Sequence, residues 1–247
     1  MVVTGWCTRL VPWFSGLDKR YCATLRFGEE TDTLDPEGEV IGRGEIPTAE
    51  AVENILERFR GPIEQIPPEY SAVHTSGERA YKLARAGKKV ELTARSVEVF
   101  GLEIDRFEPP EADISVHCSK GTYIRSLARD IGRASGSRAY LSSLRRTDIG
   151  PFSVSAARTP EDIDFGRDTI DAAAALSSIG GFYTLKVEDE IKMRIQNGVK
   201  MNPVDLGIEN NPDGESIIIS ETGELIAVIE KNGNRCGYRM VVPLRTI

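Results

Sequence analysis

The clearest pattern near the start of the chain is an alternation of apolar and polar side chains over residues 21–27 (YCATLRF). A period of two is typical of a half-buried β-strand. The sequence Asp35-Pro36-Glu37-Gly38 that follows is typical of a tight turn, because Pro presets one backbone angle and Gly accepts a positive φ. Residues 40–41 are again apolar. We therefore expect a hairpin in which residues 40–41 pair with the strand.

Two amphipathic helices are indicated further along. Residues 49–60 carry an apolar stripe with helical spacing, preceded by Thr48 as a candidate N-cap and ended by Gly61-Pro62. A second stripe runs through residues 124–131. On another ridge of that helix, three arginines are spaced four residues apart: Arg125, Arg129 and Arg133. This spacing suits successive phosphates or the orientation of a carboxylate, whereas a solvated helix face is the simpler alternative.

The remaining pattern predicts further strands and a second domain. Alternation at 97–99, 102–104 and 114–118 indicates antiparallel strands, and residues 2–11 (VVTGWCTRLV) also resemble a strand. Residues 151–182 resemble a connector. The last part has a helical pattern at 187–197 and strand patterns at 216–220, 224–230 and 237–243, which together favour a small barrel.

Composition and charge narrow the function classes. The 247 residues are 40% hydrophobic and 28% charged, which is typical of a soluble globular protein, and no segment is long and apolar enough to span a membrane. Four scattered cysteines and two histidines favour reduced cytoplasmic thiols over a metal site. The net charge of −7 hides a basic segment at 117–146, with seven basic residues and one acid. A localised basic strip favours a polyanionic partner.

Tyr21 opens the first strand after Asp18, Lys19 and Arg20. An aromatic ring with a polar tip at the mouth of an apolar face can stack on a planar ligand. A core tyrosine near a strand end is the simpler alternative.

Four strings carry a resemblance to a known family. They are DKRYCATLRFGEETDTLDPEGEV, PPEYSAVHTSGERAYKLAR, CSKGTYIRSLARDIG and YLSSLRR. Together they resemble the TruB family of tRNA pseudouridine-55 synthases. This resemblance implies an α+β fold in which a mixed, mainly antiparallel central sheet is flanked by helices and truncated at its N-terminus. It also implies a catalytic domain at 1–160 with an RNA-clamping insertion at about 62–95, and a PUA-like C-terminal β-barrel domain at 182–247.

The resemblance also implies roles for individual residues. Tyr21 would stack on the target base, Tyr123 would line the site, Arg125 would pair with the nucleophilic carboxylate, and Leu144 would lie against the base. The implied RNA-binding residues are basic: Lys19, Arg20, Arg79, Lys82, Arg85, Lys120, Arg129, Arg145 and Arg146. No metal ion and no organic cofactor is implied. The implied partner is the T stem-loop of tRNA, and we expect a cytoplasmic monomer.

The nucleophile itself is the point of departure. In the family it is an Asp on a GHTGTLDP-like loop upstream of the DKRY string, so it would precede Met1. Thr33-Leu34-Asp35-Pro36 matches part of that loop but follows the tyrosine, so we assign Asp35 no catalytic role. Two main interpretations follow: a tRNA pseudouridine synthase that isomerises uridine 55 by base flipping, or a catalytically inactive RNA-binding or RNA-folding protein on the same fold. A generic soluble α+β protein is a further alternative.

Overall fold

A computed structural model of the chain describes residues 1–75, 77–88 and 90–243. It contains two compact units, one formed by Leu17–Ser155 and the other by Met1–Gly16 together with Ala156–Ile247. The first 16 residues thus pack with the C-terminal part of the chain. The catalytic domain at 1–160 and the C-terminal domain at 182–247 stay predictions.

A six-stranded sheet with strand order β10-β9-β1-β8-β7-β4 forms the centre of the Leu17–Ser155 unit. Every pairing in it is antiparallel, which confirms the mainly antiparallel character that the resemblance implies, while no parallel pair occurs among the described strands of this sheet. Long strands β1, β7, β8 and β9 form its middle, and shorter strands lie at the edges. The strands are β1 (Lys19–Phe27), β4 (Gly61–Gln65), β7 (Arg95–Glu108), β8 (Glu111–Cys118), β9 (Ala139–Ile149) and β10 (Phe152–Ser153).

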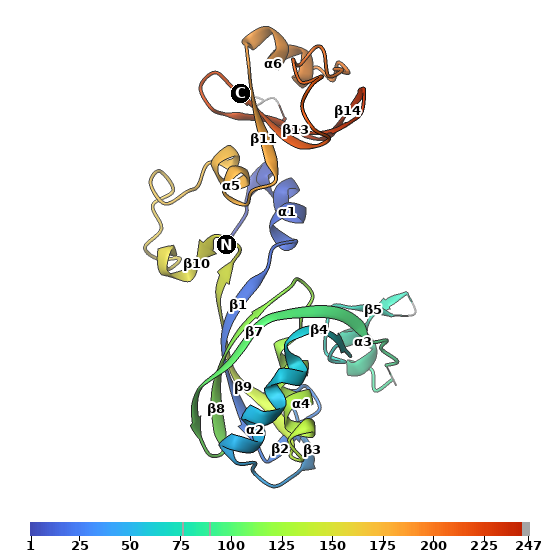
Figure 1. Cartoon of the computed structure of the whole chain (residues 1–247), viewed down its shortest axis with the longest axis vertical. Helices are drawn as coiled ribbons and strands as arrows, with labels where there is room; N and C mark the ends of the chain where they lie inside the picture. The colour runs from blue at the N-terminus through green and yellow to red at the C-terminus, as the bar shows by residue number, and fades with distance from the viewer. Residues whose placement is uncertain (76, 89, 244–247) are drawn as a thin grey trace. The chain divides into compact units, whose positions relative to one another are not determined.

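One face of this sheet is covered by helices (Figure 1). Helix α2 (Ala49–Leu56) continues into the 3-10 turn η2 (Glu57–Phe59), and the Thr48 hydroxyl caps it by accepting the Ala51 N–H at 3.2 Å. Helix α4 (Ile124–Ala134) lies beside α2 and follows β8. Because their apolar stripes face the alternating strands, one hydrophobic core forms between them.

The predicted hairpin differs from the observed one. Residues 40–41 lie in β3 (Val40–Arg43), which pairs with a separate short strand, β2 (Glu29–Thr31), and not with β1. Gly28 at φ 98° turns the chain away at the end of β1. Both edges of β1 are taken by β8 and β9, so the long-range pairs bury its apolar face instead.

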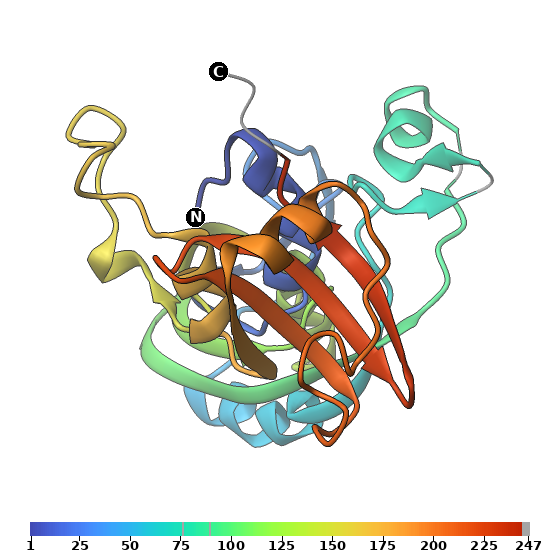
Figure 2. The same cartoon turned by 90° about the horizontal axis from the view of Figure 1, so that it is seen from above.

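An insertion separates β4 from β7. It contains β5 (His74–Thr75), β6 (Glu78–Arg79) and α3 (Ala80–Arg85), and it stands out from the sheet (Figure 2). Helix α3 carries Lys82 and Arg85, and Arg79 directly precedes it.

The second unit contains a four-stranded sheet, β11-β12-β13-β14, in which β11 and β12 are parallel. Among the described residues this sheet is open, so the closed barrel expected from the resemblance is not found. Two helices pack with it, and the 3-10 turn η3 (Val154–Ala156) precedes them in the chain. The bounds are α5 (Ala172–Ser178), β11 (Phe182–Val187), α6 (Asp189–Gln196), β12 (Gly214–Ser220), β13 (Leu225–Asn232) and β14 (Arg235–Val241).

The strand expected at residues 2–11 is helical. It forms the 3-10 helix η1 (Gly5–Leu10), followed by the short helix α1 (Val11–Ser15) with Pro12 in its first turn. Gly5 at φ 56° departs from extended backbone, and a Pro near the helix start removes no helical hydrogen bond. The Trp13 indole then donates to the Glu215 carboxylate at 2.8 Å. An apolar run with a local Gly and Pro therefore folds as helix.

Candidate functional site

The paired strands β1 and β9 place an aromatic ring, an apolar side chain and a guanidinium on one face of the sheet. Tyr21 pairs directly with Arg146, and Ala23 pairs with Leu144. Side chains of directly opposed residues point to the same face, here the face that also carries the buried Ala23. Leu144 is 48% exposed there. The structure therefore brings together Tyr21, Leu144 and Arg146.

The Tyr21 ring lies at the margin of the core, against which it packs half-buried. Burial raises the pKa of its hydroxyl above the ordinary value, and the positive charge of Arg146 opposes part of this rise. The phenol is therefore protonated at neutral pH, so it can donate a hydrogen bond while its ring remains available for stacking.

Helix α4 begins with a tight turn that presents Arg125. Gly121 has φ 85°, a region that favours Gly, and Tyr123 is extended as the N-cap residue. The Arg125 guanidinium then reaches a distant loop. Its Nη1 donates to the Asp35 carboxylate at 2.8 Å, and its Nη2 donates to the Tyr70 carbonyl at 2.9 Å. Arg125 thus joins three segments that are far apart in the sequence.

The loop between β2 and β3 has an unusual backbone at the residue before Asp35. Leu34 has φ 63°, which is rare for a residue other than Gly, Asn or Asp, and its carbonyl accepts the Leu141 N–H at 3.1 Å. The other Asp35 oxygen accepts the Thr33 hydroxyl at 2.5 Å and the Glu37 N–H at 3.2 Å. The carboxylate is therefore engaged at both oxygens, which suits a group that orients a guanidinium.

The sequence assigns Asp35 no catalytic role and gives no sign of the Tyr70 carbonyl, yet both contact Arg125 in the structure. The sequence does mark the neighbourhood of Asp35, because this residue lies within the TDTLDPEGE string that carries the family resemblance. Its contact with Arg125 spans 90 residues, however, and no local pattern reports a contact of that kind.

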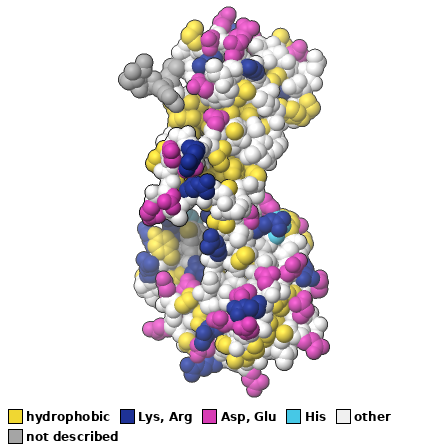
Figure 3. All heavy atoms as spheres, turned by 90° about the vertical axis from the view of Figure 1, so that its left-hand side faces the viewer, with side chains coloured by type: hydrophobic (Ala, Val, Ile, Leu, Met, Phe, Trp, Pro, Cys, Tyr) yellow, Lys and Arg dark blue, Asp and Glu magenta, His cyan; other side chains and the backbone are white. Residues whose placement is uncertain are grey.

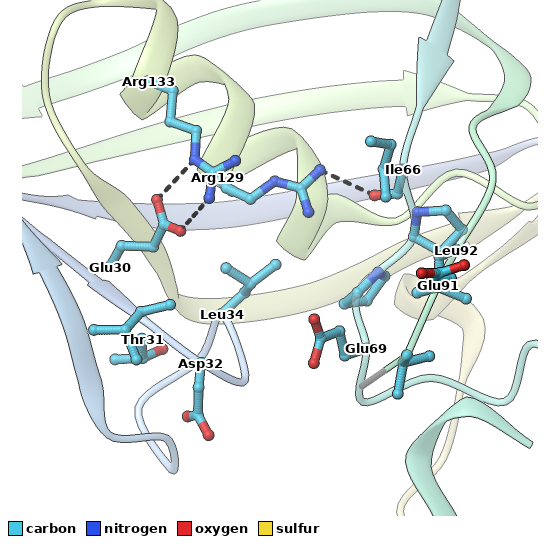
Figure 4. Close-up of a pocket in the computed structure, with 14 residues that line it drawn as sticks. Glu30, Thr31, Asp32, Leu34, Ile66, Glu69, Glu91, Leu92, Arg129 and Arg133 are labelled. Carbon is cyan, nitrogen blue, oxygen red and sulfur yellow. Dashed lines mark hydrogen bonds and ion pairs between the residues drawn. The ribbon is translucent and has the colours of Figure 1, made fainter. Parts of the chain in front are cut away.

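The other two arginines of the α4 ridge are also engaged within the protein. Arg129 donates to the Asp130 carboxylate at 2.8 Å and to the Ile66 carbonyl at 2.9 Å. Arg133 donates to the buried Glu30 carboxylate through two nitrogens (Figure 4). Phosphate binding by Arg129 stays a prediction. It would require Arg129 to give up its hydrogen bonds to Asp130 and Ile66 for bonds to a phosphate. Both arginines line a pocket of about 350 Å³. Its remaining walls are Glu30, Thr31, Asp32, Leu34, Ile41, Ile66, Pro67, Pro68, Glu69, Val90, Glu91 and Leu92.

The other predicted RNA-binding residues fall in different places. Arg20 and Arg145 oppose His117 and Cys22, so they lie on the outer sheet face, away from Tyr21. The Lys19 ammonium donates to the Leu17 carbonyl, and burial lowers its pKa. Exposed basic residues also lie at the start of the α4 turn and on the insertion, namely Lys120, Arg79, Lys82 and Arg85.

On the face shown in Figure 3, basic and acidic side chains are interspersed rather than separated into fields. Within the described ranges, no group of three or more His, Cys, Asp or Glu side chains is arranged to hold a metal ion. No helix in the described part of the chain has the length and apolar character needed to cross a membrane.

A family model described as "TruB family pseudouridylate synthase (N terminal domain)" matches residues 1–124. This match covers half of the chain. The chain belongs to the TruB family.

Curated relatives agree with this membership. The "tRNA pseudouridine synthase B" of Francisella tularensis subsp. novicida (strain U112) is 47% identical over 156 residues, which are 62% of this chain and 52% of the relative. The protein of the same name from Bordetella avium (strain 197N) is 44% identical over 179 residues, which are 71% of this chain and 73% of the relative. The chain spans about half the length of the Francisella relative.

Solved structures support the fold. A chain in "Crystal Structure of a Cbf5-Nop10-Gar1 Complex" superposes with a TM-score of 0.67 at 22% identity, over 96% of this chain and 70% of that chain. A chain in "Structure of H/ACA RNP bound to a substrate RNA containing 2'-deoxyuridine" gives a TM-score of 0.65 at 20% identity, over 97% of this chain and 70% of that chain. At this identity the likeness concerns the fold alone.

The TruB family match includes Tyr21, Asp35 and Tyr123 and ends at Ile124, directly before Arg125. The predicted roles of the individual site residues stay predictions. The structure adds a spatial grouping to them: Tyr21, Leu144 and Arg146 lie on one sheet face, and Arg125 is tied to Asp35.

Proposed function

We propose that this TruB protein acts as a tRNA pseudouridine synthase that isomerises the uridine at position 55 of the T-loop. The observation that carries the proposal is the placement of Tyr21, Leu144 and Arg146 as neighbours on one face of β1 and β9, in a chain that belongs to this family. We further propose the tRNA T stem-loop as partner, a monomer as the working form, a cytoplasmic location, and a reaction without metal ion or organic cofactor.

The first task of such a protein is to extract the base. A uridine in the T-loop is stacked and paired, so chemistry at its C1′ and C5 atoms requires it to flip out. Stacking on the half-buried Tyr21 ring would return roughly 1–3 kcal/mol of that cost. The exposed Leu144 side chain offers an apolar contact for the opposite part of the base.

The second task is isomerisation. The N1–C1′ glycosidic bond breaks, the uracil turns, C5 bonds to C1′, and the C5 proton is lost while N1 gains a proton. By the family resemblance, an Asp of the GHTGTLDP-like loop acts on the ribose, and Arg125 would orient it. Arg125 is suited to this task because Asp35 and the Tyr70 carbonyl already fix its direction.

The third task is to hold the RNA backbone. Exposed basic side chains on the insertion and near the start of α4 would contact phosphates. These contacts position RNA without reading its sequence, so they would weaken as salt increases.

The proposal is tested with two proteins and one RNA. The proteins are the 247-residue chain and a loop-extended protein, in which an N-terminal segment carrying the family's GHTGTLDP-like loop is added. The RNA is an unmodified tRNA transcript, with a T-arm hairpin as competitor and a 2-aminopurine beside the target uridine to report base extrusion.

We expect both proteins to bind the transcript and extrude the base, and the loop-extended protein to form pseudouridine at position 55. Pseudouridine at other positions only, or its absence despite T-arm binding, would contradict the proposal, and the second result would favour an RNA-binding protein. Pseudouridine formation by the 247 residues alone would show that a carboxylate within them serves as nucleophile.

A further inference from the structure

The Gln65 side chain forms two hydrogen bonds with the backbone of one residue. Gln65 ends β4 and is 2% exposed. Its Oε1 accepts the Tyr123 N–H at 2.8 Å, and its Nε2 donates to the Tyr123 carbonyl at 3.2 Å. A side-chain amide thus reproduces one rung of an antiparallel ladder at the residue that precedes α4.

This contact fixes the backbone at the start of α4. Tyr123 is extended, with φ −101° and ψ 109°, and α4 has no side-chain hydrogen bond as an N-cap. Holding both polar groups of Tyr123 against the end of β4 restrains these two angles, and they set the direction of its Cβ. Because Arg125 follows two residues later in the rigid helix, the same contact also sets where the Arg125 side chain begins.

The neighbouring bonds extend this connection along the chain. The Ser126 hydroxyl and Arg129 both donate to the Ile66 carbonyl, at 2.9 Å each, and Arg125 donates to the Tyr70 carbonyl. The beginning of the insertion, at Ile66 and Tyr70, is therefore hydrogen-bonded to the helix that carries Arg125. Gln65 and Ser126 are the buried side chains in this set, with 2% and 0% of their surface exposed.

We propose that Gln65 is a positioning residue of the base-modification site, which acts through the Tyr123 backbone to place the Tyr123 ring and the Arg125 guanidinium. This inference rests on the proposed function. An apolar side chain would pack in this buried position at least as well as an amide. The two hydrogen bonds to the Tyr123 backbone therefore explain why a polar side chain is buried here.

The test replaces the amide by a side chain of similar length, Gln65→Met. The protein is labelled with 3-fluorotyrosine, and the Tyr123 resonance among the seven tyrosines is assigned with Tyr123→Phe. We expect Gln65→Met to shift or broaden the Tyr123 ¹⁹F resonance without RNA present. The Kd for the T-arm hairpin should stay within about 2-fold, whereas base extrusion should fall about 10-fold.

The matched control is Thr24→Val, which removes a side-chain hydrogen bond to Asp113 (2.7 Å) on the other sheet face. It should leave the Tyr123 resonance and extrusion unchanged. Should Gln65→Met fail to fold, Gln65→Glu replaces it. Its protonated carboxyl can make both bonds whereas its carboxylate cannot, so the Tyr123 resonance and extrusion should return to wild-type values as pH falls.

The result that overturns the inference is an unmoved Tyr123 resonance in Gln65→Met, whatever happens to extrusion, or an extrusion equal to wild type. For Gln65→Glu it is the absence of pH-dependent recovery. Failure of the proposed function is distinguishable, because the wild-type protein would then neither bind nor extrude the T-arm base, while the resonance would still report whether Gln65 places Tyr123.

Discussion

The two faces of strand β1 differ in what they can do. The inner face carries Tyr21, with Arg146 directly opposite and Leu144 one pair further along. The outer face carries Arg20 and Cys22, with His117 and Arg145 opposite. Residues that are adjacent in the sequence, such as Arg20 and Tyr21, are therefore separated by the thickness of the sheet.

This difference shows that neighbouring arginines of a basic motif on a strand lie on opposite faces of the sheet. A string such as LRR supplies one guanidinium to each face, because side chains alternate along a strand. The inner one, Arg146, lies directly opposite Tyr21. The outer face is built instead from local polar pairs, for example Thr24 to Asp113 and Arg106 to Asp113, each at 2.7 Å. Inner-face substitutions should thus affect the base, and outer-face substitutions should affect stability or general RNA affinity.

The largest effect is expected for Arg125→Ala, on the inner side. This change removes the ion pair to Asp35 and the bonds to the Thr33 and Tyr70 carbonyls. Loss of an oriented charged donor costs about 10²–10³-fold in rate, so pseudouridine formation by the loop-extended protein should fall by that factor. Arg26→Ala, on the outer face, is the control and should keep nearly full activity. Comparable losses in the two variants would remove the distinction between faces.

Tyr21→Ala should have the next largest effect. Loss of a stacking ring costs roughly 1–3 kcal/mol, or about 5–150-fold in the extrusion equilibrium measured by 2-aminopurine fluorescence. Tyr21→Phe keeps the ring and should retain extrusion. Since burial raises the pKa of the phenol, Tyr21 should stay protonated between about pH 7 and pH 9. Ionisation of Tyr21 should therefore not change extrusion over this range. A Phe variant as defective as the Ala variant would show that the hydroxyl, and not the ring, holds the base.

Much of this arrangement could be predicted from local pattern. The alternation over residues 21–27 identified β1, and the apolar stripe of α4 identified its buried face. Pairing could not be predicted, because the partners of β1 are set by strands about 90 residues and more downstream. The contact of Arg125 with Asp35 depends on the same long-range packing. The four-residue spacing of Arg129 and Arg133 suits phosphates, but spacing gives no information on internal partners such as Glu30.

Asp35→Asn should have an intermediate effect. The amide keeps the shape of the side chain but removes the charge opposite Arg125, so the guanidinium loses its orienting ion pair. We expect extrusion to change little and pseudouridine formation by the loop-extended protein to fall about 10-fold. The control is Glu37→Gln, an exposed acid in the same turn, which should have no effect. A loss larger than that of Arg125→Ala would mean that Asp35 does more than orient Arg125.

A direct comparison of the two faces uses the adjacent pair Arg146→Ala and Arg145→Ala. Arg146 lies beside Tyr21, so its loss should weaken T-arm binding and extrusion by about 5-fold. Arg145 is exposed on the outer face, so its loss should change the Kd by about 2-fold or less at moderate salt. Titrations at two salt concentrations separate a general phosphate contact from a base-linked one. Equal extrusion defects would show that the strand twists enough for both side chains to reach the RNA.

The smallest effect is expected on the outer face and concerns acid stability. Hydrogen bonds from Arg106 and Thr24 lower the pKa of Asp113 below 3.8, its ordinary value. A carboxyl whose pKa is lower in the folded state stabilises the fold above its unfolded pKa, and this stabilisation is lost as pH falls through the folded value. Asp113→Asn should therefore lower Tm by a few degrees at about pH 6, and the gap should narrow below about pH 4. Glu103→Gln, an exposed acid on the same face, should show no such gap. A constant Tm difference from pH 6 to pH 3 would mean that Asp113 contributes through the shape of its hydrogen bonds and not through its charge, and the outer face would then be stabilised by packing rather than by ion pairs.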